Sequence, residues 1–443
     1  MSTDASVSTI DRSALMRTYA EPPVTLVRGA GTLVYDVDGK EYLDFITGLA
    51  VVSLGHSHPA VAEAVAAQAR TLTHVSNLYG NTIGPEVALT IDRLINGGTG
   101  QAGGQVFFGN SGAEANECAL KLARRWAGGG THGAHSTDGT PGTDGTDGTH
   151  APTKHVVISA DNSFHGRTLA TLTATGQPEK HAPFRPLPQG FIHVPYDDIS
   201  ALDAALDADT VAGVLLEPLQ GEGGVMVPSS DYLGAVRALC TERNALLMLD
   251  EVQTGLGRTG HWFAFLAQGL QPDVVTMAKA LGNGMPVGAC WARAEVAAAF
   301  GPGDHGSTFG GQPLAMAAVR ATLAVMEAED VCGRAQRAGA RLWDGLAALP
   351  GVVSVRGAGL LLAAQLDGPS AKEIAAAALE AGLLVNPVRP DAIRVAPPLL
   401  VSDGEIDAAL AILAGVMGTA AVAATPTGPT GPTGPTSPTG PER

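Results

Sequence analysis

The sequence predicts an α/β protein built on a mainly parallel β-sheet with helices on both faces. The first observation is a repeated alternation of short apolar runs with helix-length segments, as in "VAGVLLEP" (211–218) and "ALLMLDE" (245–251). Strands of this near-continuous apolar character are typical of parallel sheets, because both of their faces are buried. The second observation is the length of 443 residues. Single hydrophobic cores stop growing near roughly 250–300 residues, so a second, smaller unit is expected.

The expected elements begin with a hairpin. The stretch "TLVYDVDGKEYLDF" (32–45) has two alternating runs around Asp38-Gly39, a dipeptide typical of tight turns. The apolar strands of the large sheet then follow in chain order: "QVFFGN", "HVVISA", "FIHVPY", "VAGVLLEP", "ALLMLDE", "VVTMAK" and "VGACWA". The smaller unit, about Val319 to Ala424, contains three further strand-like stretches: "VVSVRGAGLLLAAQLD", "LLVNPV" and "IRVAPPLL".

Two low-complexity segments stand apart from this pattern. An insertion at about 128–152 is rich in Gly, Thr and Asp, and the tail 425–443 repeats Thr, Gly and Pro. Neither has enough apolar residues to offset the entropy of ordering, so both are predicted to be disordered.

Composition excludes several classes of protein. A formal net charge of −16 argues against nucleic acid as a partner. No signal peptide or membrane-length apolar run is present, so a cytoplasmic location with no membrane association is expected. The four cysteines are scattered and predicted to be reduced, mostly buried thiols. His56 and His58 have a spacing that could bind metal, but no third ligand is evident, and no metal is predicted.

Charged residues at strand ends carry the functional argument. Glu217, Asp250 and Lys279 each end an apolar run, and the carboxyl ends of such strands are where open α/β sheets bind ligands. A carboxylate there can keep a heterocyclic nitrogen protonated. A lysine in apolar surroundings has a lowered pKa and can form a Schiff base with an aldehyde. The alternative for Asp250 and Lys279 is a surface ion pair.

Two further motifs suit the same ligand. Ser111 and Glu114 have the form of a capping box, which leaves the N–H groups of Gly112 and Ala113 free for a phosphate, although most capping boxes bind no ligand. "SFHGRT" (163–168) could stack a planar ring and bind an anion, although alone it is better explained as a turn with a surface arginine. Together these features describe a pocket for pyridoxal phosphate.

On these motifs the sequence resembles the class III (subgroup II) pyridoxal-phosphate aminotransferases. The resemblance covers about Leu15 to Ala424 and includes the following stretches: "GLAVVSLGHSHP", "NSGAEAN", "FHGRT", "EPLQGEGG", "LDEVQTGLGRTG", "MAKALGNGMPVGA", "GSTFGGQPLA" and "IRVAPPL". It implies a type I aminotransferase fold and a homodimer, or a dimer of dimers, with active sites shared between subunits. The expected domains are an N-terminal segment 1–65 that joins the small domain, a large cofactor domain 66–318 and a C-terminal small domain 319–424.

The resemblance also implies residue roles. Lys279 would be the Schiff-base lysine, and Asp250 would pair with the pyridine nitrogen. The remaining cofactor-binding residues are expected to be Gly112, Ala113, Phe164 (stacking on the ring), Glu251, Val252, Gln253 (at the phenolic oxygen) and Thr308 (reaching the phosphate from the neighbouring subunit). The substrate-binding residues are expected to be Arg167 (at the α-carboxylate), Ser307, Glu222 and Arg394.

Glu222 and Arg394 match a switch that lets such a transaminase use two unlike substrates. The glutamate pairs with the arginine while a terminal amine reacts and then swings away so that the arginine can bind 2-oxoglutarate. The alternative is a fixed structural ion pair.

Leu49 bears on the choice of amine. The matching place in ornithine aminotransferases carries a tyrosine that holds a free α-amine, whereas leucine favours an acetylated nitrogen. The expected substrates are N2-acetyl-L-ornithine and 2-oxoglutarate; the alternatives are ornithine, succinylornithine or 4-aminobutyrate, an aminomutase, or a cofactor-free binding protein. One departure from the family pattern is Gln312, where asparagine is usual.

Overall fold

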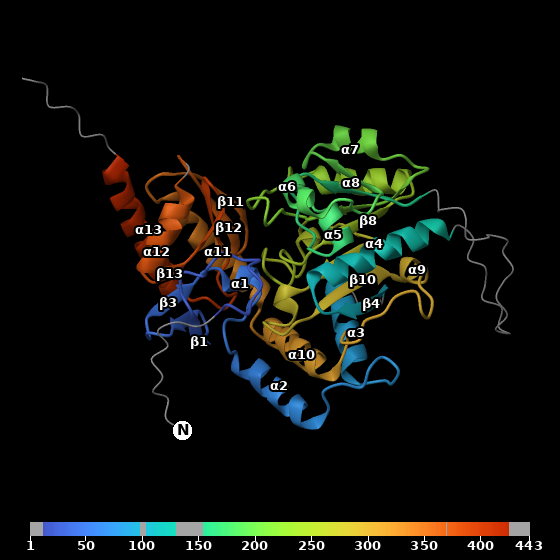
Figure 1. Ribbon diagram of the computed structural model, residues 1–443, viewed down its shortest axis with the longest axis horizontal. Helices are drawn as coiled ribbons and strands as arrows, with labels where there is room; N and C mark the ends of the chain where they lie inside the picture. The colour runs from blue at the N-terminus through green and yellow to red at the C-terminus, as the bar shows by residue number, and fades with distance from the viewer. Residues whose placement is uncertain (1–11, 98–102, 130–153, 369, 425–443) are drawn as a thin grey trace, which may run out of the picture.

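A computed structural model describes residues 12–97, 103–129, 154–368 and 370–424 of the chain. Nearly all of the predicted disordered insertion and the whole tail lie outside these residues. Figure 1 shows two lobes. The larger lobe contains a seven-stranded sheet, and the smaller lobe combines the N-terminal strands with the C-terminal part of the chain.

The seven-stranded sheet has the order β4-β10-β9-β8-β7-β5-β6. All of its neighbouring pairs are parallel except those of β10, which runs antiparallel to β4 and β9. The prediction of a mainly parallel sheet is therefore confirmed, and each strand coincides with one of the seven apolar runs. Their bounds are β4 Gly104–Gly109, β5 Val156–Ala160, β6 Phe191–Val194, β7 Val211–Leu216, β8 Leu246–Asp250, β9 Val274–Met277 and β10 Gly288–Arg293.

Successive residues of one strand enter different cores, which explains the unbroken apolar runs. In β8, Leu246 and Met248 pack in a core with Cys118 of helix α4 (Gly112–Gly128), whereas Leu247 and Leu249 pack in a core with residues of α8 (Tyr232–Glu242). In a strand covered on both faces, burying a polar side chain costs free energy at every position. This cost is avoided only where the strand ends.

The smaller lobe has two four-stranded sheets. One has the order β1-β2-β3-β13 and the other β11-β12-β15-β14. Strands β2 and β3 form the predicted hairpin around Gly39, and β13 pairs in parallel with β3, so segments from opposite ends of the chain share a sheet. The bounds are β1 Leu26–Ala30, β2 Leu33–Asp36, β3 Glu41–Asp44, β11 Val352–Ala358, β12 Leu361–Leu366, β13 Leu383–Leu384, β14 Asn386–Arg389 and β15 Ala392–Val395.

Long helices complete both lobes. Helix α2 packs on α10, and α11 and α12 pack on α13. The bounds of these helices and of the shorter ones are α1 Thr47–Ala50, α2 Pro59–Thr71, α3 Ile83–Ile95, α5 Leu169–Ala174, α6 Pro178–His181, α7 Ile199–Ala205, α9 Ala294–Ala297, α10 Pro313–Ala328, α11 Val331–Ala347, α12 Ala371–Glu380 and α13 Asp403–Ala424. Within the described residues, none of the helices combines the length and apolarity needed to cross a membrane.

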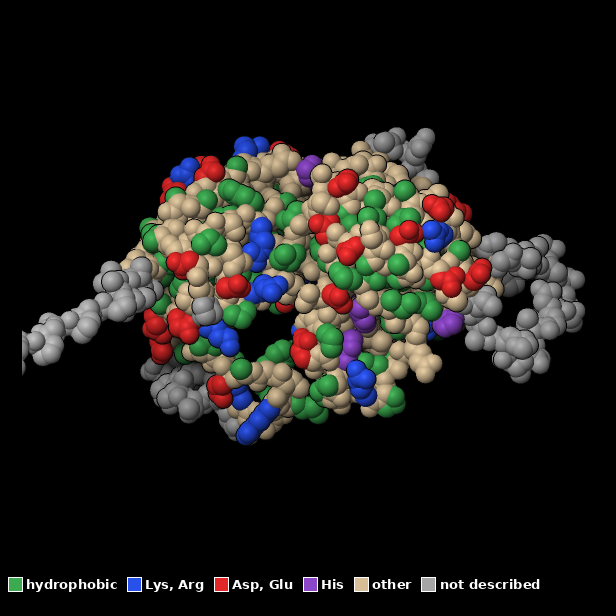
Figure 2. Space-filling model, turned by 90° about the horizontal axis from the view of Figure 1, so that it is seen from above, with side chains coloured by type: hydrophobic (Ala, Val, Ile, Leu, Met, Phe, Trp, Pro, Cys, Tyr) green, Lys and Arg blue, Asp and Glu red, His purple; other side chains and the backbone are tan. Residues whose placement is uncertain are grey.

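The contact between the lobes includes a buried cation. Arg258 is 1% exposed, and its guanidinium donates to the carbonyls of Leu360 (3.2 Å) and Pro397 (2.5 Å) and to the hydroxyl of Ser53 (3.0 Å). Figure 2 shows a hollow between the lobes with several Lys and Arg side chains at its rim.

Candidate active site

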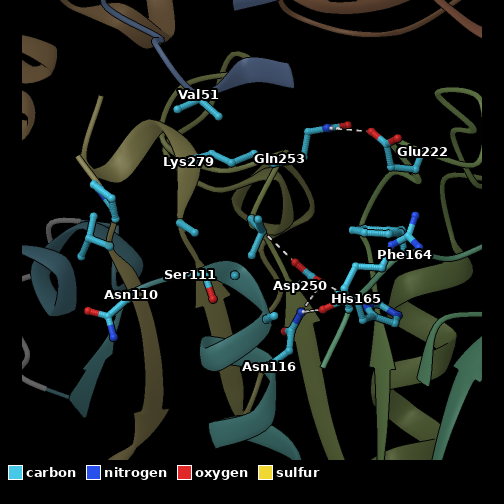
Figure 3. Close-up of a pocket in the computed structure, with 18 of the residues that line it drawn as sticks. Val51, Asn110, Ser111, Asn116, Phe164, His165, Glu222, Asp250, Gln253 and Lys279 are labelled. Atoms are coloured by element: carbon cyan, nitrogen blue, oxygen red, sulfur yellow. Dashed lines mark hydrogen bonds and ion pairs between the residues drawn. The ribbon is translucent and has the colours of Figure 1, made fainter. Parts of the chain in front are cut away.

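A cavity of ≈ 390 Å³ lies at the carboxyl ends of β7, β8 and β9. Glu217, Asp250 and Lys279, which follow or end these strands, all line it. Figure 3 shows Lys279 and Gln253 on one side, with Asp250, His165 and Asn116 on the other. The side chains that the sequence placed at three strand ends therefore share one cavity, as the parallel topology requires.

Lys279 sits in a strained turn directly after β9. Its φ of 42° lies in the left-handed region, which is uncommon for a residue with a side chain. Burial lowers the pKa of its amine, while Glu222 opposes that shift. An amine held in this way has a larger neutral, nucleophilic fraction than an exposed lysine.

Three polar contacts fix the carboxylate of Asp250. Its Oδ2 accepts from Asn116 Nδ2 (2.7 Å) and lies 2.8 Å from His165 Nδ1, and its Oδ1 accepts from the N–H of Val252 (3.0 Å). Asn116 is oriented in turn by the hydroxyl of Thr276, which donates to its Oδ1 (2.7 Å). The carboxylate is thus 3% exposed yet fully oriented toward the cavity.

The N-terminus of α4 forms another wall. Ser111 is the N-cap, and its hydroxyl accepts from the N–H of Glu114 (3.2 Å), as the capping-box prediction requires. In a capping box the Glu114 carboxylate would accept from the N–H of Ser111. Here it accepts from the N–H of Asn110, one residue earlier, at 2.5 Å. A Cβ on Gly112 would lie 2.9 Å from the side chain of Val252, so the helix start can approach β8 only with glycine there.

The "SFHGRT" loop closes the opposite side. Gly166 has a φ of 142°, and a Cβ there would lie 2.8 Å from Ala113, so the loop packs directly on the start of α4. Phe164 and Arg167 both line the cavity, with the Arg167 guanidinium 5.7 Å from the centre of the Phe164 ring. This is a cation–π distance, and the arginine remains exposed.

Glu222 and Arg394 are paired. Glu222 Oε1 accepts from Arg394 NH1 at 2.7 Å, and Gln253 and Asn386 supply further oxygens to the same guanidinium at 3.2 and 2.8 Å. The Arg394 side chain is 3% exposed and that of Glu222 31%. The arginine is therefore buried and fixed on β15, whereas the glutamate lies on a loop and is the partner with room to move. This pairing holds the pKa of Glu222 below its usual value despite burial.

Five residues singled out in the sequence do not line this cavity: Glu251, Thr308, Ser307, Leu49 and Arg394. Arg394 is next to it, since Glu222 and Gln253, which bond its guanidinium, are lining residues. The Glu251 carboxylate bonds to the Thr254 hydroxyl (2.5 Å) and the Phe265 N–H (3.1 Å), outside the cavity. Thr308 is exposed, and Ser307 lies in a loop where its hydroxyl accepts from Asn110 Nδ2 (3.1 Å). Leu49 is 37% exposed.

Val51 takes the place at the cavity wall that the sequence argument gave to Leu49. The reason is a left-handed turn: Thr47, Gly48, Leu49 and Ala50 all have φ between 51° and 67°. Such a turn reverses the direction of successive side chains relative to a right-handed helix, which residue spacing alone does not reveal.

Several lining residues were not predicted from the sequence: Val51, Asn110, Asn116 and His165. Asn116 had a signal, since it is a polar residue among the buried Ala115, Cys118 and Ala119 of α4. His165 lies inside the "SFHGRT" motif and could have been noted as a second polar side chain in that loop. His56, in contrast, pairs with Asp44 (2.7 Å) and does not line the cavity.

Comparison with known proteins places this arrangement in context. A family model described as "Aminotransferase class-III" matches residues 15–417. Proteins named acetylornithine aminotransferase are similar over most of their length. One from Mycolicibacterium smegmatis is 47% identical and covers 91% of this chain and 96% of its own, and one from Methanothermobacter thermautotrophicus is 44% identical and covers 92% and 97%.

Solved structures give the same result. An ornithine aminotransferase from Toxoplasma gondii has a TM-score of 0.82 at 34% identity and covers 93% of this chain and 94% of its own. The acetylornithine aminotransferase of Elizabethkingia anophelis has a TM-score of 0.76 at 33% identity, with coverages of 92% and 97%.

Proposed function

Because this chain belongs to the class-III aminotransferase family, we propose that it transfers the δ-amino group of N2-acetyl-L-ornithine to 2-oxoglutarate, a step of arginine biosynthesis. The chain is a pyridoxal-phosphate-dependent transaminase with the type I aminotransferase fold. The products are N-acetyl-L-glutamate 5-semialdehyde and L-glutamate. The names of its relatives support this choice of amine over ornithine, succinylornithine or 4-aminobutyrate.

The observation that carries the proposal is the cavity lined by Lys279, Asp250 and Glu222, in which the carboxylate of Glu222 is paired with Arg394. Its residues fit pyridoxal phosphate. Gly112 and Ala113 line the cavity at the start of α4, where their N–H groups suit a phosphate, and the oriented carboxylate of Asp250 faces the same cavity. When bound, the cofactor supplies an aldehyde for the amine and a protonated ring that accepts electrons.

Three other lining residues would hold the cofactor. Phe164 would stack on its ring, Gln253 would bond its phenolic oxygen, and Val252 would close the side next to Gly112. The carboxylate of Glu251 lies outside the cavity. Its contribution to the cofactor site is therefore limited to its backbone, which links Asp250 to Val252. Lys279, with its lowered pKa, takes the proton from Cδ of the amine substrate.

Arg394 and Arg167 hold the substrates. While Glu222 is paired with Arg394, the charge of the guanidinium is neutralised. The cavity then suits an amine substrate that has no carboxylate next to its reacting carbon. When Glu222 moves away, the buried guanidinium binds the carboxylate of 2-oxoglutarate at its reacting end, next to the keto carbon. Arg167, exposed at the entrance, binds the α-carboxylate of the amine substrate. The Lys and Arg side chains at the rim of the hollow between the lobes, where Asp and Glu also occur, can attract substrates that all carry carboxylates (Figure 2).

We further propose a homodimer that works in the cytoplasm. Leu78, Tyr79 and Phe309 are 87%, 74% and 65% exposed in the single chain, and they lie near the Ser307–Thr308 segment. Large exposed apolar side chains in one region are typical of protein interfaces. In the dimer, Thr308 reaches the partner's phosphate site and Ser307 the substrate. The domain division at residues 65, 318 and 424 likewise remains a proposal.

A substrate panel tests the activity. Purified protein should convert N2-acetyl-L-ornithine faster than ornithine, succinylornithine or 4-aminobutyrate, and only with 2-oxoglutarate present. Turnover of a single amino compound without 2-oxoglutarate would favour an aminomutase. The variant Lys279→Ala should lose the borohydride-reducible, covalently held cofactor; a colourless wild type that binds no pyridoxal phosphate would point to a binding protein.

A further inference from the structure

Glu217 has no role in the function described so far, although its carboxylate lines the cavity. It follows β7 and is 6% exposed. Its Oε2 accepts from the N–H of Phe164 at 3.1 Å, and its Oε1 accepts from the N–H of Gly221, also at 3.1 Å. One carboxylate therefore bonds the backbones of two different loops.

Each of these loops carries a side chain with a proposed function. Phe164 is the ring that stacks on the cofactor, and Gly221 directly precedes Glu222, the partner of Arg394. A Cβ on Gly221 would overlap the side chain of Gln253, so this stretch of backbone is packed close to the cavity. The distance between the stacking ring and the mobile glutamate thus depends on one side chain that spans both loops.

Only an ionised carboxylate serves both loops fully. A carboxylate accepts at both oxygens, whereas a protonated carboxyl uses one of them to carry a proton. Burial raises the pKa of Glu217 to about 7. His165 and Asp250 face it from the neighbouring loop and strand, and Lys279 and Tyr196 also interact with it electrostatically. A buried charge is costly, and here both of its oxygens are used.

We infer that Glu217 is a positioning residue for transamination, which holds the ring of Phe164 and the segment of Glu222 in a fixed relation through its two backbone hydrogen bonds. This inference rests on the proposed function for the reaction, but it concerns backbone contacts that can be measured without substrate.

The main test is Glu217→Gln in the holoenzyme. The amide keeps one acceptor and presents an NH₂ group to the other backbone N–H, so one loop loses its anchor. Hydrogen exchange should become faster in the peptide that contains Phe164 or in the one that contains Gly221. The amine half-reaction should slow by roughly tenfold in single-turnover measurements, and more than the 2-oxoglutarate half-reaction, because Glu222 must stay paired during the first.

Two other variants complete the design. Glu217→Asp keeps the charge but is too short to bond both loops, so it should show the same change in the ratio of the two half-reactions even if the glutamine variant does not fold. The matched control is Asp92→Asn, a buried carboxylate in α3 that accepts from Trp291 Nε1 (2.7 Å) and the Gly103 N–H (3.2 Å) outside the cavity. It should lower the melting temperature and leave that ratio unchanged.

The pH dependence gives a third readout. Wild-type half-reaction rates should rise as Glu217 ionises near pH 7, and this step should vanish in Glu217→Gln, in which His165, Asp250, Lys279 and Tyr196 remain. Glu217 variants that lose stability but keep the wild-type ratio and exchange pattern would overturn the inference. If wild type does not react with N2-acetyl-L-ornithine, the proposed function fails. Hydrogen exchange, which needs no substrate, and half-reaction rates with ornithine or 4-aminobutyrate as the amine then still decide the role of Glu217.

Discussion

At the scale of single residues, the site depends on charges that the fold takes out of water and then orients. Arg394 shows this most clearly. Its guanidinium is fixed by Glu222, Gln253 and Asn386, of which only Glu222 carries a charge, and the Glu222 side chain is partly exposed. A buried arginine bonded by one removable carboxylate and two neutral oxygens can exchange that carboxylate for the carboxylate of a substrate.

We therefore expect Arg394→Ala to impair the 2-oxoglutarate half-reaction by about a hundredfold, the size expected for a lost charge-assisted, buried contact, and the amine half-reaction much less. Stopped-flow single-turnover rates for each half measure this. Arg341→Ala is the control, since Arg341 pairs with Asp407 on the surface and should leave both halves unchanged. Equal losses in the two halves would mean that the pair is structural.

The burial of Glu251 predicts how the free energy of unfolding depends on pH. Burial raises its pKa from 4.5 to about 7, so between these values the native state binds its proton more tightly than the unfolded chain. Its contribution to the free energy of unfolding is fully present below about pH 4.5, falls as pH rises toward 7 and is absent above. A shift of this size is worth about 3 kcal/mol.

Glu251→Gln should accordingly lose less stability than wild type between pH 5 and pH 7.5. Urea denaturation at both pH values measures the difference. Glu217 has a similarly raised pKa in both proteins and supplies a common background. An identical pH dependence in the variant would show that Glu251 is ionised in the native state at pH 5.

At the scale of elements, the start of α4 is positioned by a glycine. Gly112→Ala would place a Cβ 2.9 Å from the β-branched side chain of Val252, which has little freedom to rotate away. We expect the affinity for pyridoxal phosphate to fall by roughly tenfold, because the helix start must shift from the phosphate site. Titration of the apoenzyme with the cofactor measures this.

The matched control is Gly404→Ala in the first turn of α13, where a Cβ would meet open space. Alanine favours a helix by about 1 kcal/mol over glycine, so this variant should be as stable as wild type or more so, with unchanged cofactor affinity. If Gly112→Ala also binds the cofactor normally, the N-terminus of α4 is not the phosphate site.

At the scale of the whole molecule, the proposed dimer explains why Thr308 is exposed and outside the cavity of its own chain. Mixed dimers test this. In a heterodimer of Lys279→Ala and Thr308→Ala subunits, one site has an intact lysine and, if Thr308 acts across the interface, an intact threonine from its partner. Activity should exceed that of both parent homodimers and approach half of wild type per dimer. Activity no higher than the mean of the parents would place Thr308 in its own subunit's site.

The sequence by itself determined the large sheet. All seven apolar runs became strands, and the parallel topology required Asp250 and Lys279 to meet at one edge. This succeeded because a strand buried on both faces needs an unbroken apolar run, and because charged residues are then tolerated only where the strand ends. Local motifs were also sufficient for the cap at Ser111 and for the hairpin at Gly39.

Only the tertiary structure decided which side chains reach the cavity from turns and helices. Val51 lines it in place of Leu49 because of a left-handed turn, and the carboxylate of Glu251 turns away although Asp250 beside it faces in. Asn116, His165 and Glu217 matter through bonds to residues 49 to 134 positions distant in the chain. Such contacts depend on how loops pack against one another, and neither periodicity nor spacing along the chain encodes that packing.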